Sequence, residues 1–261
     1  HSDMIEQIDL IEHLNIDSGE AKMFTMPTPL QVASVLKALE IEYDESVLLD
    51  HNAANAESDI TLSLALGMYL TDLGYVTVYN NSQKSINYAS DIQTIVEKLP
   101  ITPYVNDEFK KRFKNSLNNQ DSLCNVILSA YYEANQYITE TRNEGLGLLI
   151  LTGSYIEGLH LFTTSKFPTN WTKKKEKIYV QQKLFLENFL ILLDGYDSNA
   201  KIAVVIDYLK ELKVAFDPVK VVYNEENKSH DLTVPFTPEM EKDITTTIQE
   251  IRKRLLKEMT V

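Results

Sequence analysis

The sequence predicts a mainly all-α protein: a multi-helix antiparallel bundle with two weakly repeated halves and a small β-hairpin before the C-terminal helix. Turn-forming residues are scarce, with 8 Gly and 8 Pro among 261 residues, which favours long helices over a turn-rich β fold. Apolar residues recur at helical spacing along most of the chain. A hydrophobic share of 44% beside a charged share of 24% is typical of a folded globular protein.

The first residues of the chain differ in composition from the rest. Residues 1–20 contain acidic residues but no Lys or Arg, which predicts a solvated acidic leader over residues 1–24. A short amphipathic helix is the alternative for this leader, because its apolar residues have helical spacing. Residues 25–261 are expected to form a single helical domain. The acids of the leader are Asp3, Glu6, Asp9, Glu12, Asp17 and Glu20.

The first predicted half of this domain covers about residues 25–118. Pro29 precedes its first helix, and Ser58 is placed to cap its longest helix at the N-terminus. Pro100 ends the third helix, because proline lacks the amide hydrogen that a helix interior needs. Four helices are expected, at about residues 30–39, 60–79, 82–99 and 109–117.

The second predicted half covers about residues 119–215. Ser122 opens its first helix, Gly145 interrupts the pattern, and Gly195 divides the last two helices. Four further helices are expected, at about residues 122–144, 146–164, 172–194 and 198–213.

The end of the chain contains the one exception to the helical pattern. Two segments rich in β-branched residues, 219–223 and 231–236, flank a polar stretch and predict a β-hairpin over residues 219–236. The last helix is expected at about residues 238–258, with Pro238 at its first position, where proline is favoured.

A weak internal repeat appears when the sequence is shifted by 86 residues, since this shift places Gly153 over Gly67 and Tyr155 over Tyr69. Six of the eight glycines lie in or beside the two helices concerned. Glycine inside a helix costs about 1 kcal/mol relative to alanine, so their concentration needs a packing or functional reason. We therefore predict that the helices that carry Gly67 and Gly153 pack in direct contact.

Several segments also resemble a family of uncharacterised Bacteroidota envelope proteins. They are PLQVA (29–33), LGMYLTDLGY (66–75), NQDSL (119–123) and GSYIEGL (153–159). The resemblance covers roughly residues 25–165, and it implies a helical fold and a signal-bearing precursor that is often a lipoprotein. It implies no activity. His160 stands where the family has tyrosine after the last segment, so the resemblance implies no role for His160.

Two carboxylates are the candidate catalytic residues. Asp72 and Glu157 occupy nearby positions of the two repeated helices, so a crossing of these helices brings them together. Burial and like charge then raise the pKa of one carboxyl, as in the acid/base pair of a glycoside hydrolase. Polar residues that fix the register of two helices explain the same pattern. Tyr69, Tyr155 and His160 complete the candidate ligand-binding set, with both tyrosines as expected hydrogen-bond donors to Glu157.

We expect neither a metal nor a cofactor. Glu157 and His160 have the i, i+3 spacing of carboxylate-bridged di-iron bundles, but those sites need two such motifs and this chain has one. The chain contains no phosphate-binding loop, dinucleotide fingerprint or nucleophile elbow. Cys124 is the only cysteine, which excludes an internal disulfide and any cysteine-based metal site.

Charge and hydropathy restrict the partners. A net charge of −13 excludes general nucleic-acid binding, which depends on neutralised phosphates. No apolar stretch is expected to be long enough for a membrane span, which needs about 18 residues. The basic run at residues 173–177 indicates either a solvated face or a patch for anionic lipid.

The most favoured function is a non-catalytic cell-envelope protein, a helical scaffold or binding module for an unknown envelope ligand or protein partner. Membrane contact is then expected only through a lipid anchor upstream of residue 1, which the resemblance to the envelope family implies. The start at His1 rather than Met adds the expectation that an export signal precedes residue 1 in the precursor. The alternative is a hydrolase that uses Asp72 and Glu157 in a cleft between the two halves.

Overall fold

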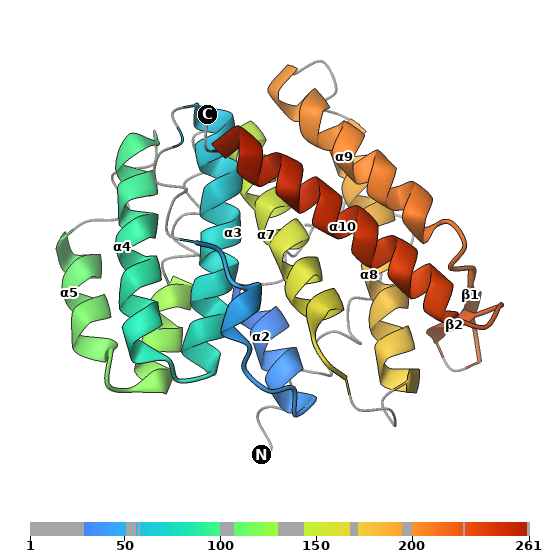
Figure 1. The fold of residues 1–261 in the computed structure, drawn as a ribbon, viewed down its shortest axis with the longest axis horizontal. Coiled ribbons are helices and arrows are strands. Elements are labelled where there is room, and N and C mark those ends of the chain that lie inside the picture. Colours follow the sequence, from blue (N-terminus) through green and yellow to red (C-terminus); the bar gives the residue numbers. More distant parts are fainter. Residues whose placement is uncertain are drawn as a thin grey trace.

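The computed structural model describes residues 29–50, 56, 58–99, 107–129, 144–167, 172–194, 200–226 and 228–259. These residues form a mainly helical protein, as the sequence predicts (Figure 1). The elements are α2 (Pro29–Ala38), the 3-10 turn η1 (Glu45–Val47), α3 (Asp59–Val78), α4 (Ser82–Lys98), α5 (Asp107–Ser116), α7 (Glu144–Thr164), α8 (Thr172–Asp194), α9 (Ala200–Phe216), β1 (Val221–Asn224), β2 (Ser229–Leu232) and α10 (Pro238–Met259). Residues 120–129 are also helical. The predicted leader, residues 1–24, and residues 130–143 of a predicted helix lie outside the described residues.

Helices α3 and α7 lie at the centre of the molecule, with α2, α4 and α10 packed against them (Figure 1). Both central helices are apolar on all sides, which is typical of a core helix. By length and composition alone both are apolar enough to cross a membrane, which corrects the expectation that no such stretch exists. In each of them 83% of the apolar window is buried inside the protein, and this burial accounts for their composition.

The crossing of α3 and α7 depends on two glycines. A Cβ atom added to Gly67 would lie 1.9 Å from the Ile150 carbonyl oxygen, and one added to Gly153 would lie 2.0 Å from the Leu64 carbonyl oxygen. The Ser154 hydroxyl donates a hydrogen bond of 2.9 Å to the Gly67 carbonyl oxygen across the contact. The prediction that these helices touch is therefore confirmed, because any side chain at either glycine would collide with backbone.

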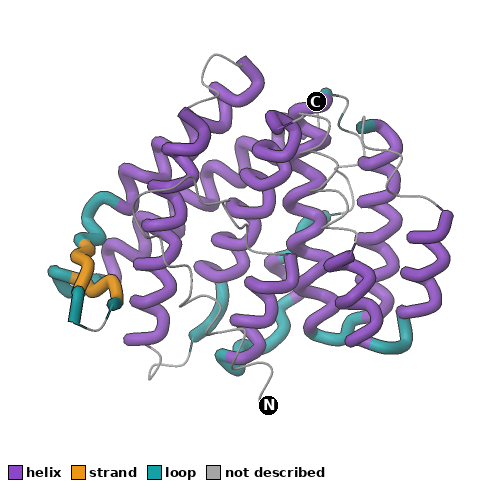
Figure 2. The backbone as a smooth tube through the Cα atoms, turned by 180° about the vertical axis from the view of Figure 1, so that it is seen from behind, coloured by secondary structure: helices purple, strands orange, loops and turns teal. Residues whose placement is uncertain are grey.

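The β-hairpin lies at one edge of the molecule, and its strand β2 contacts α8 (Figure 1 and Figure 2). Strands β1 and β2 pair antiparallel, with Val221 opposite Leu232. The predicted strand bounds, 219–223 and 231–236, are wrong at their ends, because β1 covers Val221–Asn224 and β2 covers Ser229–Leu232. Val219 does not join β1, since its amide donates to the Phe216 carbonyl oxygen at the end of α9 and its side chain is buried. Pro235 cannot extend β2, because it has no amide hydrogen to donate.

Helix α2 ends in a tight turn that redirects the chain. Glu40 has a left-handed φ of 57°, and the Ile41 amide donates a hydrogen bond of 3.0 Å to the Leu36 carbonyl oxygen. This pattern is a Schellman motif, in which the left-handed residue is usually glycine. The turn leads the chain into residues 41–50, which we call the strap. Apart from the single turn η1, the strap has no regular secondary structure.

Candidate functional site

The strap is attached to the helices by tyrosine hydroxyls. Tyr69 donates to the Asp50 carbonyl oxygen (2.6 Å), Tyr88 to that of Leu49 (2.7 Å) and Tyr79 to that of Ile41 (2.7 Å). The Tyr75 hydroxyl accepts a hydrogen bond from the Asp44 amide (3.0 Å). A loop packed against a core carries backbone groups that secondary structure does not satisfy, and here side chains of α3 and α4 satisfy them.

Beneath the strap lie four ionisable side chains, which we call the charge cluster: Asp72 from α3, Glu157 and His160 from α7, and Arg252 from α10. Asp72 and Glu157 are fully buried, and His160 is 8% exposed. Helix α10 places Arg252 there because its buried stripe packs against the core and Arg252 lies at the edge of that stripe. The residues of the stripe are Ile244, Ile248, Ile251, Leu255 and Met259.

Glu157 and Arg252 form a two-pronged ion pair. Arg252 Nε lies 2.7 Å from Glu157 Oε2, and Arg252 Nη2 lies 2.9 Å from Glu157 Oε1. The same Nη2 donates to the Val47 carbonyl oxygen at 3.3 Å. The Glu157 side chain has no exposed surface and that of Arg252 is 14% exposed. Paired geometry of this kind compensates the cost of burying the two charges, and it uses both oxygens of Glu157.

Asp72 has no cation of its own. Its Oδ2 accepts a hydrogen bond of 2.8 Å from the Leu49 amide, and its Oδ1 has no hydrogen-bond partner among the described residues. Burial and the nearby Glu157 carboxylate raise the pKa of Asp72 well above its ordinary value. The Leu49 amide and Arg252 act in the opposite direction. The cluster holds two carboxyl groups and one guanidinium, so a proton on Asp72 makes the burial electrically neutral.

His160 is a neutral member of the cluster. Burial lowers the pKa of His160 below its ordinary value, although Glu157 opposes this shift. His160 Nε2 lies 3.1 Å from the Val47 carbonyl oxygen, which only accepts, so Nε2 carries the ring hydrogen. Nδ1 is then an acceptor, and it has no hydrogen-bond partner within the described part of the chain.

The structure brings together some of the residues singled out from the sequence and separates others. Asp72 and Glu157 are neighbours, as predicted. The predicted tyrosine donors to Glu157 are wrong: Tyr69 binds the strap, and Tyr155 donates to the Gln182 carbonyl oxygen (3.0 Å) with its ring against Phe185. Both hydroxyls donate their hydrogen bonds to backbone carbonyl oxygens of other segments and not to Glu157.

Two residues of the site, Arg252 and Tyr88, were not predicted from the sequence. Arg252 is separated from Glu157 by 95 residues, and Tyr88 from Leu49 by 39. Arg252 has a detectable signal, because it follows Ile248 by four residues and precedes Leu255 by three, so it continues an apolar stripe. A cation at such a position indicates a buried anion opposite.

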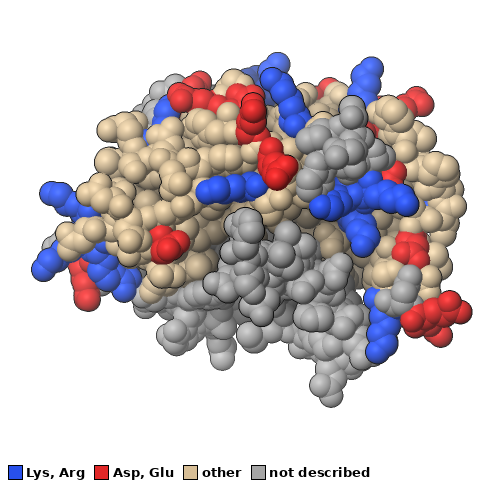
Figure 3. Space-filling view, turned by 90° about the horizontal axis from the view of Figure 1, so that it is seen from below, with Lys and Arg blue, Asp and Glu red and all other residues tan. Residues whose placement is uncertain are grey.

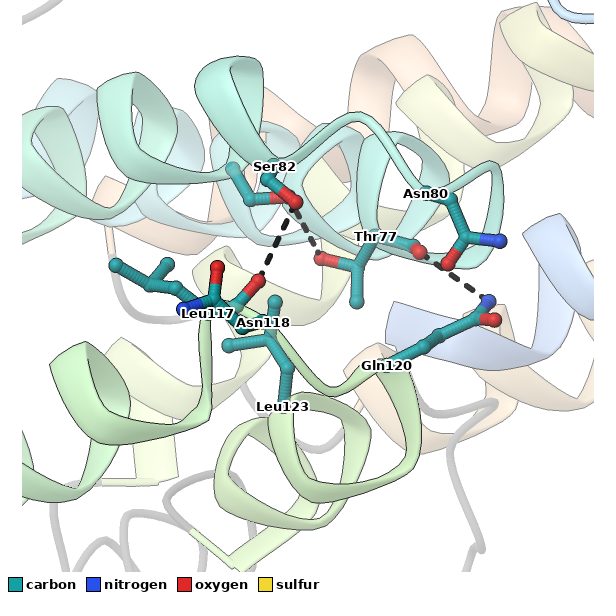
Figure 4. A pocket seen from close by; sticks show the side chains of 8 residues that line it. Thr77, Asn80, Ser82, Leu117, Asn118, Gln120 and Leu123 are labelled. Carbon is teal, nitrogen blue, oxygen red and sulfur yellow. Dashed lines mark hydrogen bonds between the residues drawn. The ribbon is translucent and has the colours of Figure 1, made fainter.

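A small pocket lies elsewhere, at the turn between α3 and α4 (Figure 4). Its volume is about 60 Å³, far below the roughly 300 Å³ at which small-molecule sites begin. The Gln120 side-chain amide donates a hydrogen bond of 2.7 Å to the Val78 carbonyl oxygen, and so satisfies a carbonyl group at the C-terminal end of α3. The residues that line the pocket are Thr77, Asn80, Ser82, Ser85, Leu117, Asn118, Gln120 and Leu123, and none of them belongs to the charge cluster.

One lysine of the basic run at the start of α8, Lys175, makes contacts within the protein. Lys175 forms an ion pair with Glu241 of α10, and its ammonium lies 5.1 Å from the centre of the Phe167 ring. Figure 3 shows acidic and basic side chains mixed over the described surface of the face seen from below. The described residues contain no group of three or more His, Cys, Asp or Glu placed to hold a metal ion.

Removing the hydroxyl of Tyr88 tests how firmly the strap is attached. Tyr88→Phe is expected to lower the free energy of unfolding by about 1–3 kcal/mol, because the buried Leu49 carbonyl oxygen loses its donor. Urea denaturation measures the change. Tyr208→Phe is the matched control, since the Tyr208 hydroxyl meets Glu258 at the exposed surface and its loss is expected to cost little. Equal costs for the two variants would contradict the role assigned to Tyr88.

Asp72 is expected to make stability depend on pH. The unfolded carboxyl ionises near pH 3.8, whereas the folded one keeps its proton to higher pH. Between these two pKa values the folded state binds more protons, so the free energy of unfolding falls as pH rises, by about 1.4 kcal/mol for each unit between the two pKa values. Asp72→Asn removes this dependence. Thermal melts from about pH 4 to about pH 8 are expected to show a smaller decline for the variant than for the wild type, and parallel declines would refute the assignment.

Fold and site together define a class of protein. It is a mainly α-helical protein in which two core helices touch at their glycines, and in which an irregular strap covers a buried cluster of charged side chains. No known protein family, curated protein or solved structure matches the chain. The resemblance of residues 25–165 to the Bacteroidota envelope family therefore stays a prediction.

Proposed function

We propose that the protein is a non-catalytic cell-envelope protein of bacteria, a helical scaffold or binding module for an envelope ligand or protein partner. The resemblance of four segments to a Bacteroidota envelope family supports the location. Its contact with the membrane is then through a lipid anchor upstream of residue 1.

The observation that carries the non-catalytic part of the proposal is the use of Glu157. Both of its oxygens are bonded to Arg252, and its side chain has no exposed surface. A general acid or nucleophile must touch its substrate, whereas this carboxylate is occupied by a neighbouring helix. The charge cluster therefore serves to hold α7, α10 and the strap together.

One observation favours the alternative, a hydrolase with Asp72 and Glu157 as its carboxylate pair. The raised pKa of Asp72 is what a general acid near neutral pH requires. Assays with a panel of nitrophenyl glycosides and esters distinguish the two functions. We expect wild type and Asp72→Asn to show the same background rate. Turnover by wild type that Asp72→Asn abolishes, with the variant still folded, would establish the hydrolase.

The envelope location has its own test. The complete gene, expressed with a C-terminal tag in a Bacteroidota host, is expected to encode an export signal and to give a product in the envelope fraction. Cross-linking in intact cells is then expected to join the tagged protein to a defined envelope partner. A product found in the cytoplasm, from a gene without a signal, would contradict the proposal.

A further inference from the structure

The strap is held by contacts that it can lose without disrupting any helix. Between Val47 and Asp50 its backbone is bonded to side chains from four helices: Asp72, Tyr69, Tyr88, His160 and Arg252. None of these bonds belongs to a helical or strand ladder. Separation of the strap from the core therefore costs side-chain contacts and the burial of Ile41 and Leu49, each 5% exposed, while α3, α4, α7 and α10 stay intact.

The other elements around Asp72 have little freedom to move. Helices α3 and α7 meet backbone to backbone at Gly67 and Gly153. Helix α10 is fixed by its buried stripe. The strap, in contrast, begins at Glu40, whose left-handed φ of 57° is unfavourable for a residue with a side chain. Release of the strap removes this constraint, which makes Glu40 a natural hinge.

The charge around Asp72 changes by one unit when its carboxyl ionises. The titratable or charged groups that act on it come from each element packed around it among the described residues: Tyr43 from the strap, Tyr75 from α3, Tyr88 from α4, Glu157 from α7 and Arg252 from α10. Arg252 is the single cation of this set and Glu157 already binds it. Ionised Asp72 thus adds an unpaired negative charge to a buried site, which is costly without water.

We propose that the strap is a proton-dependent latch: it stays docked while Asp72 keeps its proton, and it lifts when Asp72 ionises, so that water reaches the charge cluster. The closed state holds one proton that the open state does not. Its opening constant therefore rises about tenfold per pH unit between the pH at which Asp72 ionises in the open state and the higher pH at which it ionises in the closed state. The latch acts on the strap alone and is independent of whether the protein is a scaffold or an enzyme.

Hydrogen exchange of the full chain, followed by mass spectrometry, tests the latch from about pH 5 to about pH 9. The readout is the protection factor of strap peptides that contain the Asp44 and Leu49 amides, corrected for the intrinsic effect of pH on exchange. Peptides from α3 report global unfolding. We expect strap protection in the wild type to fall by up to about tenfold per pH unit while α3 stays protected.

Two variants remove the latch by different routes. Asp72→Asn cannot ionise, yet it still offers an oxygen to the Leu49 amide. Glu157→Gln leaves Arg252 free to neutralise an ionised Asp72. Both are expected to keep strap protection constant with pH, whereas the exposed control Asp243→Asn behaves like wild type. Constant protection in the wild type, an equal fall in Asp72→Asn, or loss of α3 protection in step with the strap would each overturn the proposal.

Discussion

Replacing Gly153 by leucine is expected to lower the free energy of unfolding by several kcal/mol and to leave a large fraction of the protein unfolded. Even the first atom of the new side chain, its Cβ, would lie 2.0 Å from the Leu64 carbonyl oxygen. Overpacking against movable side chains costs about 1–3 kcal/mol, and a collision with helix backbone exceeds that range. Helices α3 and α7 must therefore separate, which opens the centre of the core. Urea denaturation followed by circular dichroism measures the loss.

Gly158→Ala is the matched control on the same helix. Its Cβ would lie 3.1 Å from the Val32 Cγ2 atom, which belongs to a side chain that can adjust by a few tenths of an ångström. We expect a change within about 1 kcal/mol, since the higher helix propensity of alanine offsets the tighter contact. If Gly153→Leu proved as stable as Gly158→Ala, the close approach of α3 and α7 would be refuted.

Arg252→Met is the second substitution with a large expected effect. It leaves the Glu157 carboxylate buried without a cation, and removal of one partner of a buried ion pair typically costs about 3–5 kcal/mol. It also removes one of the two donors to the Val47 carbonyl oxygen. We expect a marked fall of the melting temperature at neutral pH, measured by a thermal melt followed by circular dichroism.

Two comparisons isolate the buried pair. Arg254 lies two residues further along α10 and pairs with Glu211 at the surface, where the side chains are 43% and 41% exposed. Arg254→Met is therefore expected to cost at most about 1 kcal/mol. The double variant Glu157→Leu/Arg252→Met is expected to regain most of the stability lost by Arg252→Met, because no lone charge remains. A double variant less stable than Arg252→Met would show that the pair is not coupled in this way.

Local patterns in the sequence were sufficient for the fold class. Helical spacing identified the elements, and Ser58 caps α3 as predicted, because its hydroxyl accepts a hydrogen bond from the Thr61 amide. Helix α4 ends at Lys98, two residues before Pro100 in the sequence. The concentration of glycines predicted the crossing, because a helix tolerates glycine at this density only where another backbone comes close. The internal repeat also predicted this contact between α3 and α7. The division of the chain into two halves stays a prediction from the sequence.

The partners of the charge cluster could not be predicted in the same way. A carboxylate in an apolar helix shows that some compensating group exists but does not identify it. Tyr155 was expected as a partner because it lies two residues from Glu157, and Tyr69 because the repeat places it on the crossing helix, whereas the actual partner comes from a helix 95 residues away. The strap carbonyls also competed for the tyrosine hydroxyls, and nothing in the sequence of residues 41–50 reveals that this irregular segment lies over the core.

The link between Arg252 and Val47 spans 205 residues, which has a consequence for the order of folding during synthesis. A ribosome releases Glu157 and the strap long before it makes α10. Until then Glu157 cannot be buried without an uncompensated charge, so a nascent chain can form α3 and α7 but cannot complete their core. Contacts this distant in sequence also slow folding. A fragment that ends before Arg252 is therefore incomplete as a fold, and the intact cluster is a chemical sign that translation has reached the last helix.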